Sequence, residues 1–153
     1  MSMFCIALAH IKLLARALHT LSLSSATESN AMPYIARADY AKQKEFVGNG
    51  ECVTLVRHLT GARASSLWRE GNKVPDLLEQ GGIAKGTVIA TFVNGRYQNL
   101  RQGNHAALFI RQVPGGIAIF DQWRNHKPSA RVIYFGRSAA GASNRPERYS
   151  IVE

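Results

Sequence analysis

The stretch FVGNGECVTLVRHLTG, residues 46–61, combines a glycine-rich turn, a cysteine and an apolar segment. Its apolar residues recur at the spacing of one helix face: Cys52, Val53, Leu55, Val56 and Leu59. Gly48 and Gly50 precede this helix and Gly61 ends it, so Cys52 lies where the helix begins. The free amides and the positive dipole end at a helix start favour a thiolate. The position therefore indicates a reactive thiol, whereas a cysteine used for packing is usually inert.

Length and composition place the chain among folded globular proteins. Its 153 residues suffice for one domain with a modest core, and 46% of them are hydrophobic. The net charge of +9 comes from scattered basic residues, with no block of like charges that would indicate a nucleic-acid-binding tail. No apolar run approaches the roughly 18–20 residues of a membrane span. The positive charge indicates either solubility or attraction to a polyanion such as nucleic acid, anionic lipid or bacterial cell wall.

The first 31 residues differ in composition from the rest of the chain. They begin apolar and become rich in Ser, Thr and Ala, with Ser29 and Ala31 spaced as at a signal-peptide cleavage site. Three interpretations stay open for residues 1–31: a disordered or non-native extension, an export signal, and an amphipathic helix. The folded domain is predicted to span residues 32–153. It then contains a single cysteine, Cys52, which gives neither a disulfide framework nor a zinc cluster.

From residue 32 onward, helical patterns come first and strand patterns follow. Helices are expected at residues 39–45, 51–61 and 64–71, before a loop at 72–86. Five β-rich segments bounded by turn signals come next: 87–93, 104–112, 116–123, 131–137 and 148–153. This order predicts an α+β fold in which N-terminal helices pack on an antiparallel sheet of about five strands.

A histidine and the polar end of a strand complete the candidate chemistry. His105 opens the second predicted strand, while Asp121 and Gln122 end the third, across a tight turn. Because opposed residues of paired strands lie about 5 Å apart, His105 can meet the end of the next strand. A thiolate, an imidazole and a polar group that fixes the imidazole tautomer are the arrangement of nucleophilic acyl transfer. The backbone N–H of Cys52, with a neighbouring amide or the region of Glu51, would form the oxyanion hole.

Four motifs taken together resemble a known superfamily: GNGECV (48–53), GTVIATF (86–92), GNHAALFI (103–110) and IAIFDQW (117–123). In order and local structure they are similar to CHAP and NlpC-type papain-like cysteine amidases and peptidases, in which the cysteine begins a helix and the histidine begins a strand. The resemblance covers residues 48–123, about half of the chain. More narrowly, the chain is similar to small bacterial CHAP-like proteins, a class that includes peptidoglycan amidase effectors delivered by type VI secretion.

The resemblance implies a role for each matching residue. Cys52 corresponds to the nucleophile and His105 to the general base. Asp121 is favoured over Gln122 as the third residue because a carboxylate best stabilises an imidazolium, although side-chain alternation does not decide between them. Glu51 stands where many CHAP members have Gln. The residues expected to bind substrate are Asn49, Gly50, Glu51, Trp68, Tyr97, Asn104 and Trp123. The mechanism requires no metal and no cofactor.

The sequence thus predicts a cysteine amidase or peptidase that hydrolyses amide bonds in the peptide stems of bacterial peptidoglycan. The resemblance implies an antibacterial effector, made in the bacterial cytoplasm and secreted or delivered to the periplasm of a target bacterium, with a cognate immunity protein as a partner. Neither nucleic-acid binding nor stable membrane insertion is expected. Two alternatives remain: an acyl-transfer enzyme of the deamidase or transglutaminase type acting on a protein, and an inactive module that binds the wall or a partner.

Overall fold

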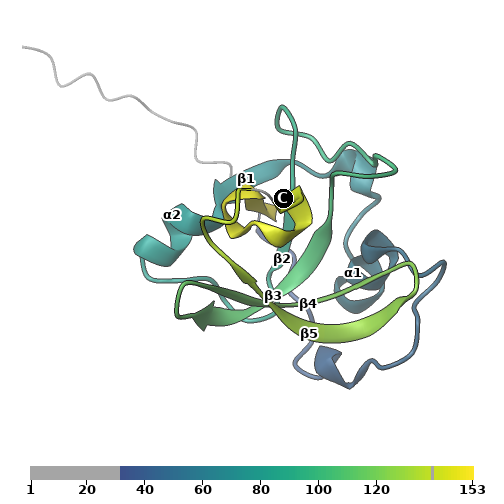
Figure 1. The fold of residues 1–153 in the computed structure, drawn as a ribbon. Helices are drawn as coiled ribbons and strands as arrows, with labels where there is room; N and C mark the ends of the chain where they lie inside the picture. Colours follow the sequence, from purple (N-terminus) through teal and green to yellow (C-terminus); the bar gives the residue numbers. More distant parts are fainter. Residues whose placement is uncertain (1–31, 139) are drawn as a thin grey trace, which may run out of the picture. The chain divides into compact units, whose positions relative to one another are not determined.

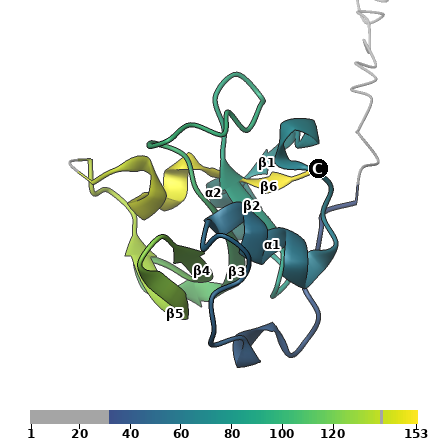
Figure 2. The ribbon, with the colours of Figure 1, turned by 90° about the vertical axis from the view of Figure 1, so that its right-hand side faces the viewer.

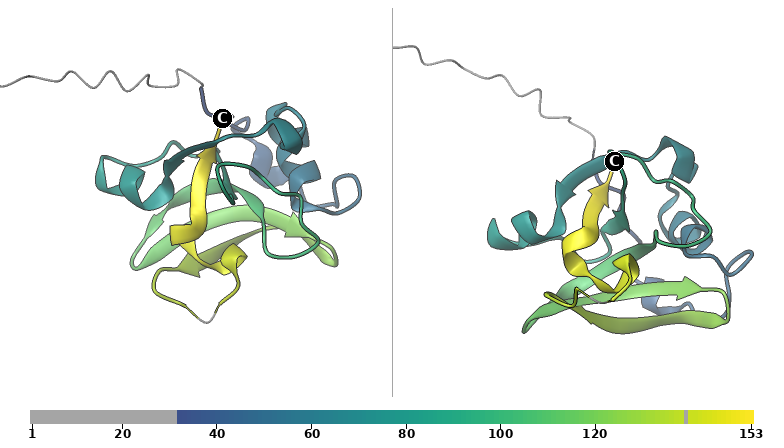
Figure 3. Two further views of the ribbon diagram at one scale, coloured as in Figure 1. Left: turned by 90° about the horizontal axis from the view of Figure 1, so that it is seen from above. Right: turned by 45° about the horizontal axis from the view of Figure 1, so that its top comes forward.

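The computed structural model describes residues 32–138 and 140–153, so the three interpretations of residues 1–31 lie outside the described residues. One antiparallel sheet has the strand order β1-β6-β2-β3-β4-β5 (Figure 1). The strands are Glu70–Lys73 (β1), Val88–Thr91 (β2), Ala106–Val113 (β3), Gly116–Trp123 (β4), His126–Tyr134 (β5) and Tyr149–Val152 (β6). Strands β2 to β5 form a meander, and β6 returns to lie between β1 and β2 (Figure 3).

Two α-helices accompany the sheet, Cys52–Thr60 (α1) and Val74–Glu79 (α2). Four 3-10 turns complete the regular structure: Tyr40–Lys42 (η1), Ser65–Leu67 (η2), Ala142–Asn144 (η3) and Pro146–Arg148 (η4). Helix α1 ends at Gly61, whose φ of 72° gives the left-handed cap that the sequence predicted. This helix packs across β3 and β4 (Figure 2), whereas α2 contacts β1 and β6. The sheet therefore has a helix on each side.

Both faces of the central strands are buried, which is why their sequences are nearly continuous apolar runs. On the α1 face, Val88, Leu108 and Phe120 pack with Leu55 and Val56. On the opposite face, the buried side chains include Ile89, Phe109, Ile117, Ile119, Ile133 and Tyr149. Burying one such side chain stabilises a fold by about 1.5–3 kcal/mol. The buried strands are therefore stable, and they hold the residues at their ends in fixed positions.

The observed architecture confirms the α+β class with an antiparallel sheet and corrects its details. The five expected strands correspond to β2–β6, but the sheet has a sixth strand, β1, whose sequence EGNK is polar. It forms because it satisfies the backbone groups along the edge of β6, a tertiary effect that overrides strand propensity.

The expected N-terminal helices are also wrong in part. The segment 39–45 contains only the single turn η1, and the segment 64–71 contains the turn η2 and the first half of β1. The expected loop at 72–86 contains the rest of β1 and helix α2. In η1 the one buried side chain is Tyr40, which packs edge-to-face on Phe120 with ring centroids 5.5 Å apart. Within the described residues, α1 is therefore the one α-helix that precedes the sheet.

Candidate active site

The turn before α1 places Cys52 at the first position of the helix. Gly48 and Gly50 have φ angles of 57° and 78°, in the left-handed region that favours glycine. The side-chain oxygen of Asn49 accepts a hydrogen bond of 3.1 Å from the Glu51 N–H. Within residues 32–138 and 140–153 no side chain caps the helix, so its first amides keep the free N–H groups characteristic of a helix start. Asn49 and Gly50 therefore shape the turn rather than line a cleft.

Gln122 holds the same turn from the sheet. Its buried amide accepts a hydrogen bond of 3.1 Å from the Val47 N–H and donates to the carbonyl oxygens of Val47 and Glu51, each at 2.9 Å. The side chain thus faces the loop before α1, and none of its hydrogen bonds within the described residues reaches the imidazole of His105. Its contacts fix the start of the helix that carries Cys52.

The strand register brings His105 and Asp121 together. Leu108 of β3 pairs with Phe120 of β4, so the residue that precedes β3 lies beside the end of β4. Nε2 of His105 is 2.7 Å from Oδ2 of Asp121, and the exposed fractions of these two side chains are 7% and 0%. Of the two polar residues considered for contact with the imidazole, Asp121 is therefore the one that touches it.

Because Asp121 occupies Nε2, the second ring nitrogen of His105 remains for its hydrogen bond with Cys52. Burial raises the pKa of the Cys52 thiol, but the hydrogen bond and charge of His105, followed by the Tyr97 hydroxyl and the Ala106 N–H, outweigh it and leave this pKa below its ordinary value. Burial lowers the pKa of His105, whereas its bonds to Asp121 and Cys52 raise it, to a net value of about 9. Both shifts favour the charged forms, so the arrangement favours a thiolate beside an imidazolium.

Arg131 of β5 is a contact that the sequence-based prediction missed. Its Nε and Nη2 atoms lie 2.9 and 2.8 Å from Oδ2 of Asp121. Burial raises the pKa of Asp121, but His105 and then Arg131 lower it, and the net pKa is below its ordinary value. A signal was present in the sequence, because Arg131 stands two residues before the buried Ile133 and so shares its face of the strand.

A cleft of about 710 Å³ lies over Cys52 and His105. Four of the residues predicted to bind substrate line it: Glu51, Tyr97, Asn104 and Trp123. Trp68 does not, because its side chain is 1% exposed and packs edge-to-face on the Tyr97 ring at 5.1 Å. The structure therefore places Trp68 in the core, beneath Tyr97, and not in the wall of this cleft.

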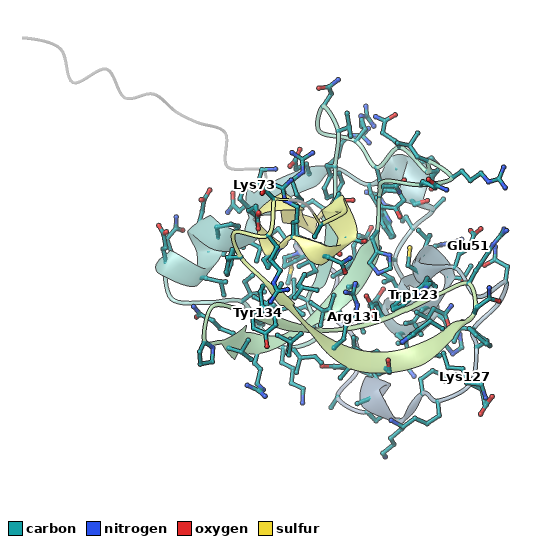
Figure 4. All side chains as sticks on the ribbon, in the orientation of Figure 1. Glu51, Lys73, Trp123, Lys127, Arg131 and Tyr134 are labelled. Atoms are coloured by element: carbon teal, nitrogen blue, oxygen red, sulfur yellow. The ribbon has the colours of Figure 1, made fainter. Side chains whose placement is uncertain are left out.

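Two aromatic residues border the reacting groups. The Tyr97 hydroxyl lies 3.6 Å from the Cys52 sulfur. Trp123 is 38% exposed, with its ring 6.3 Å from that of His105 and stacked on His126 at 3.7 Å. Figure 4 shows Trp123 beside Arg131, whose guanidinium carbon is 5.3 Å from the Trp123 ring. The cleft therefore has a hydroxyl donor close to the sulfur and an aromatic wall beside the imidazole.

Within the part of the chain that the structure describes, no three His, Cys, Asp or Glu side chains are grouped as they would be around a metal ion. In the same part, no helix is long and apolar enough to cross a membrane.

A thiol at a helix start, with a histidine and a carboxylate from two adjacent strands, has the geometry of a cysteine-dependent acyl-transfer enzyme. The family model described as domesticated amidase effector 2 matches residues 23–151. The chain belongs to this family. The resemblance to amidase effectors inferred from the four sequence motifs is thereby confirmed.

Individual relatives agree with this assignment. The chain is 40% identical over 136 residues to the type VI secretion amidase effector 2 protein of Salmonella typhi, covering 80% of this chain and 100% of that protein. It is 32% identical over 112 residues to the domesticated amidase effector 2 of Ixodes scapularis, covering 69% and 72%. A solved structure of a type 6 secretion amidase effector 2 has a TM-score of 0.64 and 39% identity, covering 77% of this chain and 93% of that one.

Proposed function

We propose that the chain hydrolyses amide bonds in the peptide stems of bacterial peptidoglycan, with Cys52 as nucleophile, His105 as general acid and base, and Asp121 as the residue that orients His105. The observation that carries this proposal is the buried contact of 2.7 Å between His105 and Asp121, next to a thiol whose pKa His105 lowers. Membership in a family of amidase effectors supports the reaction class.

The reaction takes place in two stages. The Cys52 thiolate attacks the carbonyl carbon, and the developing oxyanion receives hydrogen bonds from the Cys52 N–H and the Tyr97 hydroxyl. The C–N bond then breaks as the His105 imidazolium gives its proton to the leaving amine, which leaves a thioester on Cys52. In the second stage, neutral His105 takes a proton from water and the water oxygen attacks the thioester. The C–S bond breaks, a carboxylic acid leaves, and the thiolate and imidazolium are restored.

The charge of the cleft supports an acidic substrate. Arg101 and Arg124 line it, and Arg124 is paired with Glu51 at 3.1 Å. Arg101 has no ion-pair partner among residues 32–138 and 140–153, so it adds a free positive charge to the cleft wall. Peptide stems that carry carboxylates match this charge, and the chain's net charge of +9 would further attract it to anionic wall polymers.

We propose that the chain is an antibacterial effector with a papain-like fold. The chain would be made in a bacterial cytoplasm and act in the periplasm of a target cell, and a cognate immunity protein would block the cleft in the producing cell. The family name of the relatives supports this setting.

Digestion of purified muropeptides, followed by mass spectrometry, tests the proposal. The wild-type chain is expected to yield a new amine and a new carboxylic acid whose summed mass exceeds that of the substrate by the mass of one water. Cys52→Ala is expected to yield neither product, whereas His58→Gln, which changes an exposed histidine on α1, is expected to match the wild type. Full activity of Cys52→Ala would contradict the assigned nucleophile. If muropeptides stay intact but Cys52 reacts with a thiol reagent, a deamidase or transglutaminase acting on a protein is favoured. If Cys52 is unreactive as well, an inactive binding module is favoured.

A further inference from the structure

The buried end of the site contains more than a histidine and a carboxylate, because Arg131 reaches the same carboxylate from β5. We propose that Arg131 is a positioning residue that holds the Asp121 carboxylate ionised and turned toward His105 throughout the reaction. This inference rests on the proposed function, since it assigns Arg131 to the site of that reaction. It accounts for a charged side chain that the two-stage mechanism leaves without a role.

The contacts of Asp121 show how its orientation is fixed. Oδ2 receives Nε2 of His105 at 2.7 Å, and Nε and Nη2 of Arg131 at 2.9 and 2.8 Å. Oδ1 lies 3.2 Å from Nε of Arg131. Every one of these partners is a donor, so the carboxyl group fits its surroundings only when it is ionised and acts purely as an acceptor. Turning the carboxylate away from His105 would break the contacts with Arg131 as well.

Arg131 is itself held in place. Its Nη1 donates to the side-chain oxygen of Asn144 at 2.6 Å, and its Nη2 donates to the Ser143 carbonyl at 3.1 Å. The guanidinium carbon lies 5.3 Å from the Trp123 ring, beside which it is drawn in Figure 4. The side chain is 21% exposed. Contacts from η3 and from the end of β4 therefore fix the guanidinium group that binds Asp121.

The reaction cycle explains why a permanent charge is useful there. His105 is an imidazolium before it protonates the leaving amine and a neutral imidazole afterwards. Asp121 is 0% exposed, so without Arg131 it would become an isolated buried carboxylate in the second state, which is costly. Arg131 stays charged in both states, and Asp121 therefore need not take up a proton or reorient.

The other titratable groups near Asp121 cannot supply this charge. They are the Cys52 thiolate, His105 itself and the Tyr149 phenol of β6, whose pKa burial and the Asp121 charge raise well above its ordinary value. Tyr149 is therefore neutral over the working range. Among the groups facing Asp121 in the described residues, Arg131 is the one whose positive charge does not depend on the reaction.

Two substitutions separate the charge of Arg131 from its shape. In Arg131→Gln the positive charge is lost, so the thiolate is less stabilised and the midpoint of Cys52 ionisation should rise by about one pH unit. Arg131→Lys keeps the charge without the fork, so the midpoint should move by less than half as much, while kcat falls about tenfold with little change in KM. A purely structural role would lower activity without moving the midpoint.

The experiment measures alkylation of the full chain by iodoacetamide from pH 4 to 10, read on the tryptic peptide 45–57 so that Cys5 does not interfere. Arg111→Gln, an exposed arginine of β3, is the matched control and should leave the midpoint unchanged. An unchanged midpoint in Arg131→Gln, or equal shifts in Arg131→Gln and Arg131→Lys, would overturn the proposal. If Arg131→Gln does not fold, Arg131→Lys provides the test. A shift of one full pH unit in its Cys52 midpoint, or an unchanged kcat, would then overturn the proposal.

This readout distinguishes the two proposals, because alkylation needs no peptidoglycan. A wild-type chain that leaves muropeptides intact contradicts the proposed function, whereas the midpoints of the Arg131 variants bear on Arg131 alone.

Discussion

Replacing Asp121 with Asn removes one charge from the buried end of the site with little change in shape. Oδ2 of Asp121 accepts from both His105 and Arg131. An amide oxygen in that position could keep those contacts, but the amide nitrogen would then stand at the Oδ1 position, 3.2 Å from Nε of Arg131. One donor would face another there, and neither His105 nor Arg131 would keep its counter-charge.

The structure gives the size of the expected effect. The pKa of His105 is about 9, against an ordinary value of 6.5. The difference corresponds to about 3 kcal/mol, or roughly 300-fold in the imidazolium population. Burial is the largest influence on this pKa and lowers it, and the bond to Asp121 is the largest influence that raises it. Asp121→Asn should therefore lower the pKa of His105 and reduce hydrolysis at neutral pH by on the order of 10²–10⁴-fold.

Two measurements check this prediction. The midpoint of the alkylation rate of Cys52 against pH should move to higher pH in Asp121→Asn, because burial then raises the pKa of the thiol with less opposition from His105. Turnover of muropeptides should fall by the factor given above. Asp76→Asn makes the same charge change on the exposed face of α2 and should behave as the wild type. A wild-type alkylation profile in a folded Asp121→Asn chain would refute the reasoning, because His105 would then not depend on the carboxylate.

Two further predictions concern stability. Gln122→Leu removes the amide that holds the loop before α1, so urea denaturation should give a free energy of unfolding lower by about 2–3 kcal/mol, with reduced turnover; the exposed Gln112→Leu should change neither, and equal stability of the two variants would contradict the role of Gln122. In the pH dependence of unfolding, the raised pKa of His105 contributes stability that is full below pH 6.5 and is lost as the pH rises through about 9. The lowered pKa of Cys52 contributes stability that is present above pH 9.0 and is lost as the pH falls through its folded value, so the two slopes oppose each other in the wild type. Cys52→Ser removes the opposing slope and also the part of the His105 shift that Cys52 causes, while the bond to Asp121 still raises the pKa of His105. Its melting temperature should therefore fall more steeply than that of the wild type as the pH rises above 6.5, and parallel curves would argue against the ion pair.

The choice between Asp121 and Gln122 shows what the sequence could not decide. Alternation assigns side chains to faces when one face of a strand is exposed, but β4 is buried from Gly116 to Gln122. Both residues lie in a fully buried stretch, so the pattern does not indicate which side chain faces His105. The register that pairs Leu108 with Phe120 separates them, and register comes from long-range pairing rather than from local pattern.

Other errors have the same origin. The polar segment of β1 becomes a strand only because β6 offers it an edge, and β5 begins at His126, five residues before the apolar part that predicted it. Trp68 is buried because the loop that carries Tyr97 folds over it, a contact distant in sequence. By contrast, the glycines before Cys52 and the cap at Gly61 are local signals, and the structure follows them.

The most direct test of the account is digestion of muropeptides in ¹⁸O-labelled water by the wild type and by Cys52→Ala. Wild-type products should carry one ¹⁸O in a newly formed carboxylate and appear together with a newly freed amine, and Cys52→Ala should form no such products. Labelled products formed equally well by Cys52→Ala would contradict this expectation, because hydrolysis would then not pass through the Cys52 thiol.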